Sequence, residues 1–396
     1  MASPIQGVDF ISSMPDVILH HIVSFIPIKL AIITSALSRR WRHVWCGTPC
    51  LDFDRYDGAE AINQTLNSYR AQKITSFDLS MSECVPEPQI DSWIEFAMSR
   101  NVEKMSLSLS GFVDEETYRF PDSFYLSSSL EELWLDFVMI PGCTVSWKSL
   151  RRLTLCETKQ SLADILTGCP VLETLELLDC GGVQRLDLTK SPTLTRLTVF
   201  LGQFHIIAPH IRYLKLTSTK EQCTLVDVSS LIEASLAICL EANTYGYSSG
   251  NYLGAGDYLP LQNMVLKMLA KLQNVKKLTF GSTFLQDANL ARCLDSQGLD
   301  PNQCWRSKLY EAFPTSADYH YDFSRFSSKL VASFIEMVLK NAKTLETLTV
   351  ALKHIRYRGA GKCFKELLQM HPTLSNNNNV SIEFRRLVFS SMFYLV

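Results

Sequence analysis

The sequence predicts an α/β protein with two parts: three short N-terminal helices, followed by a solenoid of about ten irregular repeats. Two observations support this fold class. Between residues 14 and 45, apolar residues recur at the spacing of amphipathic helices. From residue 74 onward, one pattern recurs along most of the chain: apolar, two variable, apolar, one variable, apolar. A chain of 396 residues has room for both parts.

The first helix is predicted to begin at Pro15 and Asp16. Pro suits the first turn of a helix, and an Asp there complements the positive end of the helix dipole. Apolar residues follow at helical spacing until Pro27, which ends the segment. A second short helix is expected over 28–34, and a third is expected from residue 38 onward.

Three short helices cannot bury all of this apolar surface among themselves. Domains below about 40 residues usually need disulfides, a metal or a partner. The local cysteines, Cys46 and Cys50, are not interpreted as a metal site. Periodicity alone therefore leaves two interpretations: a helical cap on the following domain, or a module that docks on a partner protein.

A family resemblance bears on this choice. The residues that carry it are Met14-Pro15, Ile18-Leu19 and Ile22, followed by Leu37-Ser38-Arg39-Arg40-Trp41. The stretch resembles an F-box, the helical module that docks on the Skp adaptor of SCF-type (Skp–cullin–F-box) cullin–RING ubiquitin ligases. Met14 stands where the family usually has Leu, and this substitution conserves volume. The run LSRRWRHVW followed by LDFD resembles plant F-box proteins in particular.

The resemblance implies binding to a Skp-family adaptor and, through it, to a cullin–RING ligase. Pro15 and Ile18 are expected to form the edge that inserts into the adaptor. Leu19, Ile22 and Trp41 are expected to support the helices beneath. The implied adaptor-binding residues are Met14, Pro15, Ile18, Leu19, Ile22, Leu37, Ser38 and Trp41.

The recurring pattern indicates leucine-rich repeats. It starts at residues 74, 102, 130, 150, 172, 194, 211 and 231, with later copies at 275 and 345. The first eight starts lie 17 to 28 residues apart, in or near the leucine-rich-repeat range. An ordinary αβ domain with irregular spacing is the alternative. In a repeat, each copy contributes one strand to a shared core, so Leu133, Leu175, Leu197 and Leu348 are expected to be buried. Gly168-Cys169-Pro170 is expected to end a convex-side helix.

Strand alternation also predicts a binding surface. Residues next to the second and third apolar positions point to the opposite, open face of the strands, expected to be concave. This places seven residues on one surface as a client-binding prediction: Trp134, Arg152, Glu176, Arg196, Phe200, Tyr213 and Lys215. Trp, Tyr and Arg are the residue types that most often carry binding energy at interfaces. The alternative is that a neighbouring loop covers Trp134 and Phe200.

The predicted domains are an F-box over 8–54, leucine-rich repeats over 70–285, a polar insertion over 286–328, and a terminal repeat with a C-terminal region over 329–396. A second insertion, rich in Gly, Tyr and Ser, covers 245–258. The C-terminal region resembles that of plant F-box/leucine-rich-repeat proteins of the FBD type. A helix is expected from residue 330, leading into a strand that ends at residue 350, and a last strand is expected over 380–384.

Composition excludes several function classes. A net charge of −2 and a pI near 6.5 argue against binding to nucleic acid or a membrane surface through bulk charge. The sequence has no 18-residue uncharged apolar run and no signal-peptide pattern, so a cytoplasmic or nuclear location with reduced cysteines is expected. It contains no nucleophile elbow, Walker loop or paired-His zinc motif. No cofactor, metal or catalytic residue is predicted.

The sequence therefore predicts a non-catalytic substrate-recognition subunit of an SCF-type E3 ligase. The helices would dock the adaptor, and the repeats would bind an unknown client protein. The alternative is a small-molecule or hormone receptor that uses the solenoid as a ligand pocket, because some plant relatives bind hormones and a polyphosphate there. A receptor of that kind would need converging Lys and Arg side chains, but Glu132, Asp136 and Glu176 interleave with the open-face bases.

Overall fold

The computed structural model describes residues 14–81, 85–109, 118–136, 144–157, 162–180, 185–200, 204–218, 223–238, 268–281, 332, 335–336, 338–340, 342–353, 360–375 and 380–387. Two compact units make up the chain, the first ending at Leu172 and the second beginning at Glu173. The predicted insertions at 245–258 and 286–328 lie outside the described residues.

The N-terminal helices form as predicted at their start and become irregular toward their end. Helix α1 (Asp16–Val23) begins directly after Pro15, and α2 (Ile28–Ile33) begins directly after Pro27, because each proline holds an extended backbone conformation that a helix can follow. The predicted third helix is instead a series of 3₁₀ turns, η2 (Trp41–His43) and η3 (Trp45–Gly47), after an earlier turn η1 (Thr34–Ala36). Their i→i+3 hydrogen bonds tighten the backbone of this segment.

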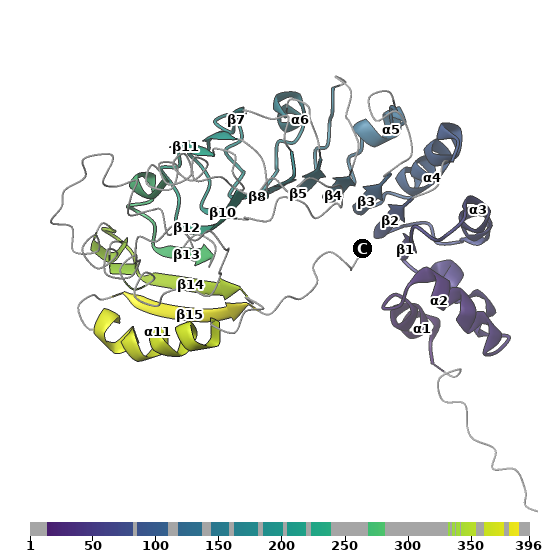
Figure 1. Cartoon of the computed structure of the whole chain (residues 1–396). Coiled ribbons are helices and arrows are strands. Elements are labelled where there is room, and N and C mark those ends of the chain that lie inside the picture. Colours follow the sequence, from purple (N-terminus) through teal and green to yellow (C-terminus); the bar gives the residue numbers. More distant parts are fainter. Residues whose placement is uncertain are drawn as a thin grey trace, which may run out of the picture. The chain divides into compact units, whose positions relative to one another are not determined.

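The first unit continues with five parallel strands in chain order (Figure 1). They are β1 (Cys50–Phe53), β2 (Ser76–Ser80), β3 (Lys104–Ser108), β4 (Glu132–Asp136) and β5 (Arg152–Cys156). The helices of this unit are α3 (Ala59–Ser68), α4 (Glu87–Ser99), α5 (Asp122–Tyr125) and α6 (Ala163–Thr167). Strand β1, from the LDFD run, adds a strand before the first predicted repeat.

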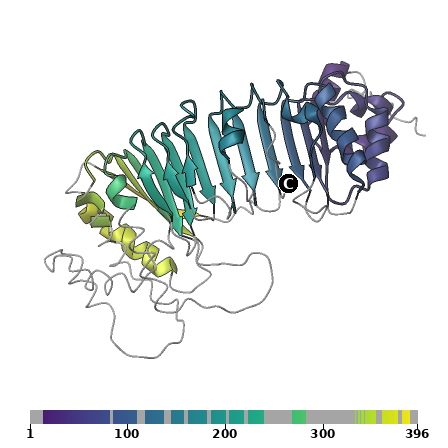
Figure 2. The ribbon, with the colours of Figure 1, turned by 90° about the horizontal axis from the view of Figure 1, so that it is seen from above.

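In its described residues, the second unit has seven parallel strands of the main sheet, in the order β6-β8-β10-β12-β13-β14-β15. They are β6 (Thr174–Leu178), β8 (Arg196–Phe200), β10 (Tyr213–Ser218), β12 (Glu233–Ile238), β13 (Lys277–Gly281), β14 (Thr347–Lys353) and β15 (Ser381–Leu387), and Figure 2 shows them side by side. Helix α11 (Ala360–Ser375) packs on β15.

A second sheet in this unit was not predicted. It consists of β7 (Arg185–Asp187), β9 (His205–Ile207) and β11 (Thr224–Asp227), in the order β11-β9-β7. Each of these short strands lies between two strands of the main sheet along the chain and buries one apolar side chain, Leu186, Ile206 and Leu225 respectively. These repeats therefore close their outer side with a strand where the first unit uses helices.

The apolar ladder forms as predicted. Leu133, Leu175, Leu197 and Leu348 are all at most 2 % exposed. Leu175 and Leu197 are also register partners on adjacent strands. Burial of the second and third apolar positions fixes which face of each strand points inward, because strand side chains alternate between the two faces.

Helix α6 ends before Gly168, as the sequence predicts, but for a different reason. Gly168 has an ordinary right-handed backbone conformation, φ −81°, so no left-handed turn requires glycine here. A Cβ atom at this position would lie 2.2 Å from the Val145 carbonyl oxygen. Close packing of two backbone segments is therefore what requires a residue without a side chain.

Candidate docking site

Apolar side chains gather on the outer sides of the N-terminal helices. Seven of them are between 41 % and 78 % exposed: Val17, Ile18, Ile22, Phe25, Leu30, Ile33 and Leu37. We call this set the apolar docking face. Single exposed apolar residues are common on soluble proteins, but a group of this size on one short module is typical of a surface that another protein covers.

The docking face exists because these helices are apolar on two sides. The inner side is covered: Leu19 and Val23 of α1 and Ile28 and Ala31 of α2 are at most 2 % exposed. The outer side of α1 carries Ile18 and Ile22 one turn apart, and Phe25 follows in the turn after the helix. Forty residues cannot supply a second layer for this outer side, so it remains in solvent.

The predicted adaptor-binding residues fall into two groups. Pro15, Ile18 and Leu37 are exposed and Met14 is half-buried, so these side chains can be reached by a partner. Leu19 and Trp41 are buried and support the helices.

The expectation that Ile22 would support the helices from beneath was wrong. Ile22 is 41 % exposed, whereas Leu19 and Val23 are at most 1 % exposed, so Ile22 lies at the edge of the buried side of α1. Its position one helical turn after Ile18 places it on the docking face.

Ser38 and Arg40 hold the module together by polar contacts. The Ser38 hydroxyl accepts a hydrogen bond from the Trp41 backbone N–H at 3.4 Å and so caps the turn that follows. The Arg40 guanidinium donates to the Asp16 carboxylate at 2.9 Å and to the Met14 backbone oxygen. Residues 38–43 therefore lie beside the first turn of α1.

Val17, Phe25, Leu30 and Ile33 were missed as candidate contacts. The signal was present in the sequence: apolar residues occupy five of the eight positions of α1 and five of the six of α2, including positions that cannot share the buried side. Val17 and Phe25 are the two most exposed members of the docking face.

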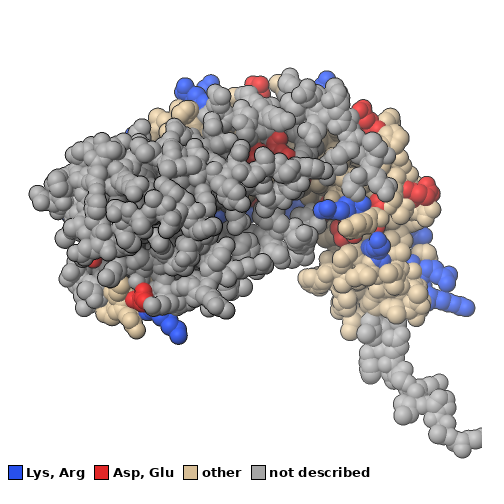
Figure 3. Space-filling model, viewed as in Figure 1, with Lys and Arg blue, Asp and Glu red and all other residues tan. Residues whose placement is uncertain are grey.

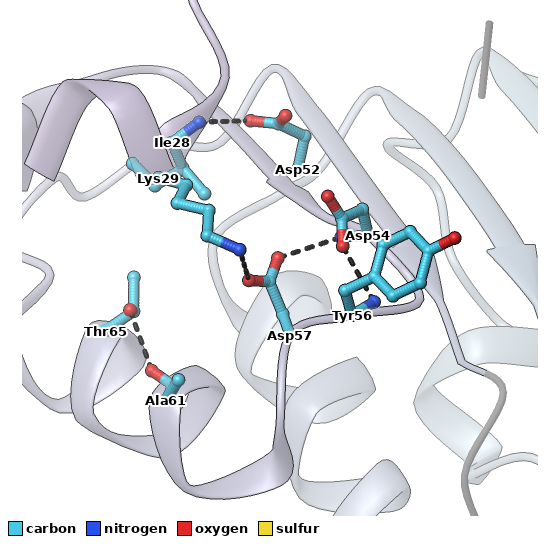
Figure 4. A network of polar contacts seen from close by, with 8 residues as sticks. All are labelled: Ile28, Lys29, Asp52, Asp54, Tyr56, Asp57, Ala61 and Thr65. Carbon is cyan, nitrogen blue, oxygen red and sulfur yellow. Dashed lines mark hydrogen bonds and ion pairs between the residues drawn. The ribbon is translucent and has the colours of Figure 1, made fainter.

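The helices are joined to the first repeat through carboxylates of the β1 strand and the loop after it (Figure 4). The Ile28 backbone N–H, at the start of α2, donates to the Asp52 Oδ1 at 2.7 Å. Lys29 pairs with Asp57 at 3.4 Å. Asp54 and Asp57 each accept a backbone N–H of this same loop, at 2.7 Å from Tyr56 and 3.0 Å from Asp54. The loop is thus ordered by its own side chains where it meets α2.

The pKa of Asp52 is raised to about 6, mainly by burial; the hydrogen bond from Ile28 opposes this shift and the nearby Asp78 carboxylate adds to it. Asp52 and Asp78 are register partners on β1 and β2, so two carboxylates face the same side of the sheet. Burial also raises the pKa of Asp78, while hydrogen bonds from Ser76 and Ser106 oppose the shift. The junction therefore holds a carboxylate whose charge is costly.

The second candidate surface is the open face of the strands in the second unit. Arg196 of β8 and Tyr213 of β10 are register partners, and the guanidinium carbon lies 5.1 Å from the ring centroid. This is within the range of a cation–π interaction. Lys215, two residues further along β10, is exposed and forms no ion pair with any described residue. Glu176 and Phe200 are half-buried on the same face.

Trp134 and Arg152 lie on the open face of the first unit. Trp134 is half-buried, in register with Ser106 on one side and Thr154 on the other. Arg152 and Lys104 both pair with Glu132, at 3.3 Å and 3.0 Å. The two bases of this face thus share a single carboxylate and do not form the converging cationic cluster that a polyphosphate site would need.

Within the described part of the chain, no group of His, Cys, Asp and Glu side chains is placed to hold a metal ion. Cys46, Cys50 and Cys169 are free thiols. Burial raises the pKa of the Cys169 thiol to about 12, which disfavours the reactive thiolate. None of the described helices has the length and apolar character to span a membrane.

Comparison with known proteins agrees with both parts of the fold. Residues 11–52 match the F-box domain family, and residues 90–295 match the repeats of the FBD-associated F-box protein At5g56370. Among Arabidopsis thaliana proteins, the putative F-box/LRR-repeat protein At5g02700 is 47 % identical, with 96 % of this chain and 94 % of the relative covered. F-box/LRR-repeat protein At5g02910 is 39 % identical, with 96 % of each chain covered.

These matches indicate the general role of the architecture. F-box domains generally bind Skp adaptors in SCF complexes, and F-box proteins with leucine-rich repeats generally act as non-catalytic substrate adaptors. The helical module with its exposed apolar face, the parallel strands with their leucine ladder, and the identity along nearly the whole length agree with one another. The chain belongs to the plant F-box/leucine-rich-repeat protein family.

Proposed function

We propose that this chain is the substrate-recognition subunit of an SCF-type E3 ubiquitin ligase. The observation that carries the proposal is the apolar docking face, seven exposed side chains above a fully buried inner layer. The domains assigned to this role are the F-box over 8–54, the repeats over 70–285, and the C-terminal region over 329–396. Catalysis would belong to partner enzymes, and the chain would supply binding and geometry that make ubiquitin transfer effectively intramolecular.

The client-binding site is proposed on the open face of the second unit, around Arg196, Tyr213 and Lys215. The cation–π pair of Arg196 and Tyr213 presents an aromatic ring and a guanidinium that are already positioned. Less side-chain entropy is then lost on binding. Glu176 and Phe200 extend this surface, and Trp134 and Arg152 provide separate candidates in the first unit.

The docking proposal is tested with the full chain and a purified Skp-family adaptor. Changing Pro15 and Ile18 together to Ala should abolish adaptor binding, and Leu37→Asp should do the same because it places a charge in the apolar contact. The matched control is Leu126→Asp: Leu126 is 63 % exposed, close to the 70 % of Leu37, but it lies after α5. Undiminished binding of both F-box variants would exclude this docking face.

The client proposal needs a client, which proximity labelling under proteasome inhibition can supply. Changing Arg196 and Tyr213 to Ala should remove the labelled client while adaptor binding and thermal stability persist. Trp134→Ala as a separate variant tests the first unit. The control changes Arg212 and Val226, two exposed residues outside the strand positions that form the open face, to Ala. If the client is retained by a variant that combines Trp134→Ala with the Arg196 and Tyr213 changes, the site lies elsewhere in the chain.

A further inference from the structure

The F-box module carries a charge opposite to that of the chain. Residues 14–49 contain Lys29, Arg39, Arg40 and Arg42 but only one acidic residue, Asp16, which gives a net charge of +3 with His neutral. The whole chain has a net charge of −2. A charge asymmetry of this kind affects which partners a surface binds and how fast they associate, and it does not determine the fold.

The positive side chains lie on one side of the 3₁₀ segment. Trp41, Val44 and Trp45 point inward and are at most 8 % exposed. Arg39, Arg42 and His43 alternate with them and are exposed. Figure 3 shows Lys and Arg side chains projecting from this N-terminal part of the molecule, at the right of the view. The outer side of this segment is therefore basic.

This basic side borders the apolar docking face. The Arg40 guanidinium bonds to Asp16 and to the Met14 backbone oxygen, which holds the segment beside Pro15 and the first turn of α1. Leu37, 70 % exposed, immediately precedes it in the chain. An apolar centre with a polar, charged edge is the usual anatomy of a protein–protein interface.

Arg39 and Arg42 form no ion pair with any described residue of the chain. Elsewhere in the first unit, Lys73, Lys104 and Arg152 are each paired with a glutamate. Arg40 is likewise paired, with Asp16. Arg39 and Arg42 are thus two guanidinium groups next to the docking face that have no ion-pair partner within the described part of the chain, and guanidinium is well suited to bind carboxylates of another chain.

We propose that Arg39 and Arg42 form a cationic rim that binds acidic side chains at the edge of the adaptor surface that receives the docking face. This inference rests on the proposed function. It adds that the partner surface is acidic and that Arg39 and Arg42 bind it. The apolar face would supply most of the affinity, and the rim would speed association and orient the encounter.

The test measures association and dissociation rates of a purified Skp-family adaptor with the full chain at low and high salt. Arg39→Glu with Arg42→Glu should lower the association rate roughly tenfold or more at low salt. The difference from wild type should shrink at about 1 M salt, where the Debye length is about 3 Å. The dissociation rate should change much less than the association rate.

Lys148→Glu with Arg212→Glu is the matched control, because both residues are exposed, lie outside the F-box, and change the net charge by the same amount. Arg39→Gln with Arg42→Gln, which removes the charges without reversing them, should give an intermediate association rate. This variant is used instead if Arg39→Glu with Arg42→Glu unfolds the module. If wild type fails to bind the adaptor, the proposed function itself is wrong. If wild type binds and the Arg39 and Arg42 variants associate like the control, the docking face stands and the cationic rim is wrong.

Discussion

Asp52 lies on β1, the first strand of the parallel sheet, and its carboxylate accepts a hydrogen bond from the first turn of the F-box helix α2 at 2.7 Å. Neither Pro15 nor Pro27, the residues before α1 and α2, offers a side chain that can cap a helix. Asp52, 24 residues away in the sequence, therefore caps the N-terminus of α2. The same carboxylate is partly buried near Asp78 and Asp57, and its pKa is raised to about 6.

Replacing Asp52 with Asn should stabilise the first unit at neutral pH. The Asn side chain keeps an oxygen that can accept the Ile28 N–H and removes the partly buried charge. The expected gain in the free energy of unfolding is about 1 kcal/mol after allowance for solvent screening at this partly exposed site. Asp52→Ala, which also removes the acceptor, should be about 1 kcal/mol less stable than Asp52→Asn. Urea unfolding of the three proteins measures both differences.

The pH dependence of this effect has a defined sign. The pKa of Asp52 in the folded protein, about 6, lies above its ordinary value of 3.8, so the folded state binds more protons between these values. The stabilising contribution of the protonated form is complete below pH 3.8 and is lost as pH rises through about 6. The advantage of Asp52→Asn over wild type should therefore grow between pH 3.8 and about pH 6 and stay level above that range. If the difference in the free energy of unfolding between Asp52→Asn and wild type does not change with pH, the ionisation of Asp52 is not its cause.

At the scale of elements, two buried side chains fix the orientation of each strand, and the side chains on its other face remain accessible to a partner. On β6, Leu175 and Leu177 are fully buried, while Thr174 and Glu176 are half-buried on the other side. The helices of the F-box differ, because they are apolar on both sides and only one side is covered. The repeats are thus stable by their own stacking, whereas the F-box leaves apolar surface for a partner.

Leu175→Ala should lower the free energy of unfolding of the second unit by about 2–5 kcal/mol, because it removes buried methyl groups and leaves a cavity against Leu197. Glu176→Ala is the neighbouring control on the opposite face and should change stability by about 0.5 kcal/mol or less. Urea titrations of the two variants provide the comparison. Equal stability of Leu175→Ala and wild type would mean that the repeat register is wrong.

At the scale of the whole molecule, the chain forms two compact units that meet in sequence between Leu172 and Glu173. Repeats contact mainly their neighbours, so stability in such a fold is a sum of local terms. The F-box belongs to the first unit and is fixed to its first strand. The client surface proposed around Arg196 belongs to the second unit. Docking and client binding are therefore expected to respond separately to substitution.

Leu133→Ala in the first unit and Leu348→Ala in the second test this independence. Each should increase hydrogen exchange in the strands of its own unit and leave the strands of the other near their wild-type protection. Mass spectrometry of peptides from β2–β4 and from β10–β14 measures the two responses in one experiment. Equal loss of protection in both units after either change would show that the chain unfolds as one cooperative block.

The sequence by itself determined the elements that depend on local periodicity. The strands of the ladder, the burial of Leu133 and Leu348, and the start of α1 at Pro15 all follow from the spacing of apolar residues and from proline geometry. Repeated spacing is robust because every copy must satisfy the same shared core. The family resemblance of residues 14–41 followed from the same kind of local pattern.

Only the tertiary structure decided which apolar side is covered and which distant groups meet. Periodicity could not assign Ile22 to the outer side of α1, because both sides are apolar and the choice depends on what packs against them. The second sheet closes the outer side of its repeats with strands too short to show clear periodicity. The capping of Ile28 by Asp52, 24 residues away, and the tether from Arg40 to Asp16 are contacts between segments that no local spacing relates. These features depend on how the elements pack against one another and on which side of the F-box helices remains exposed to solvent.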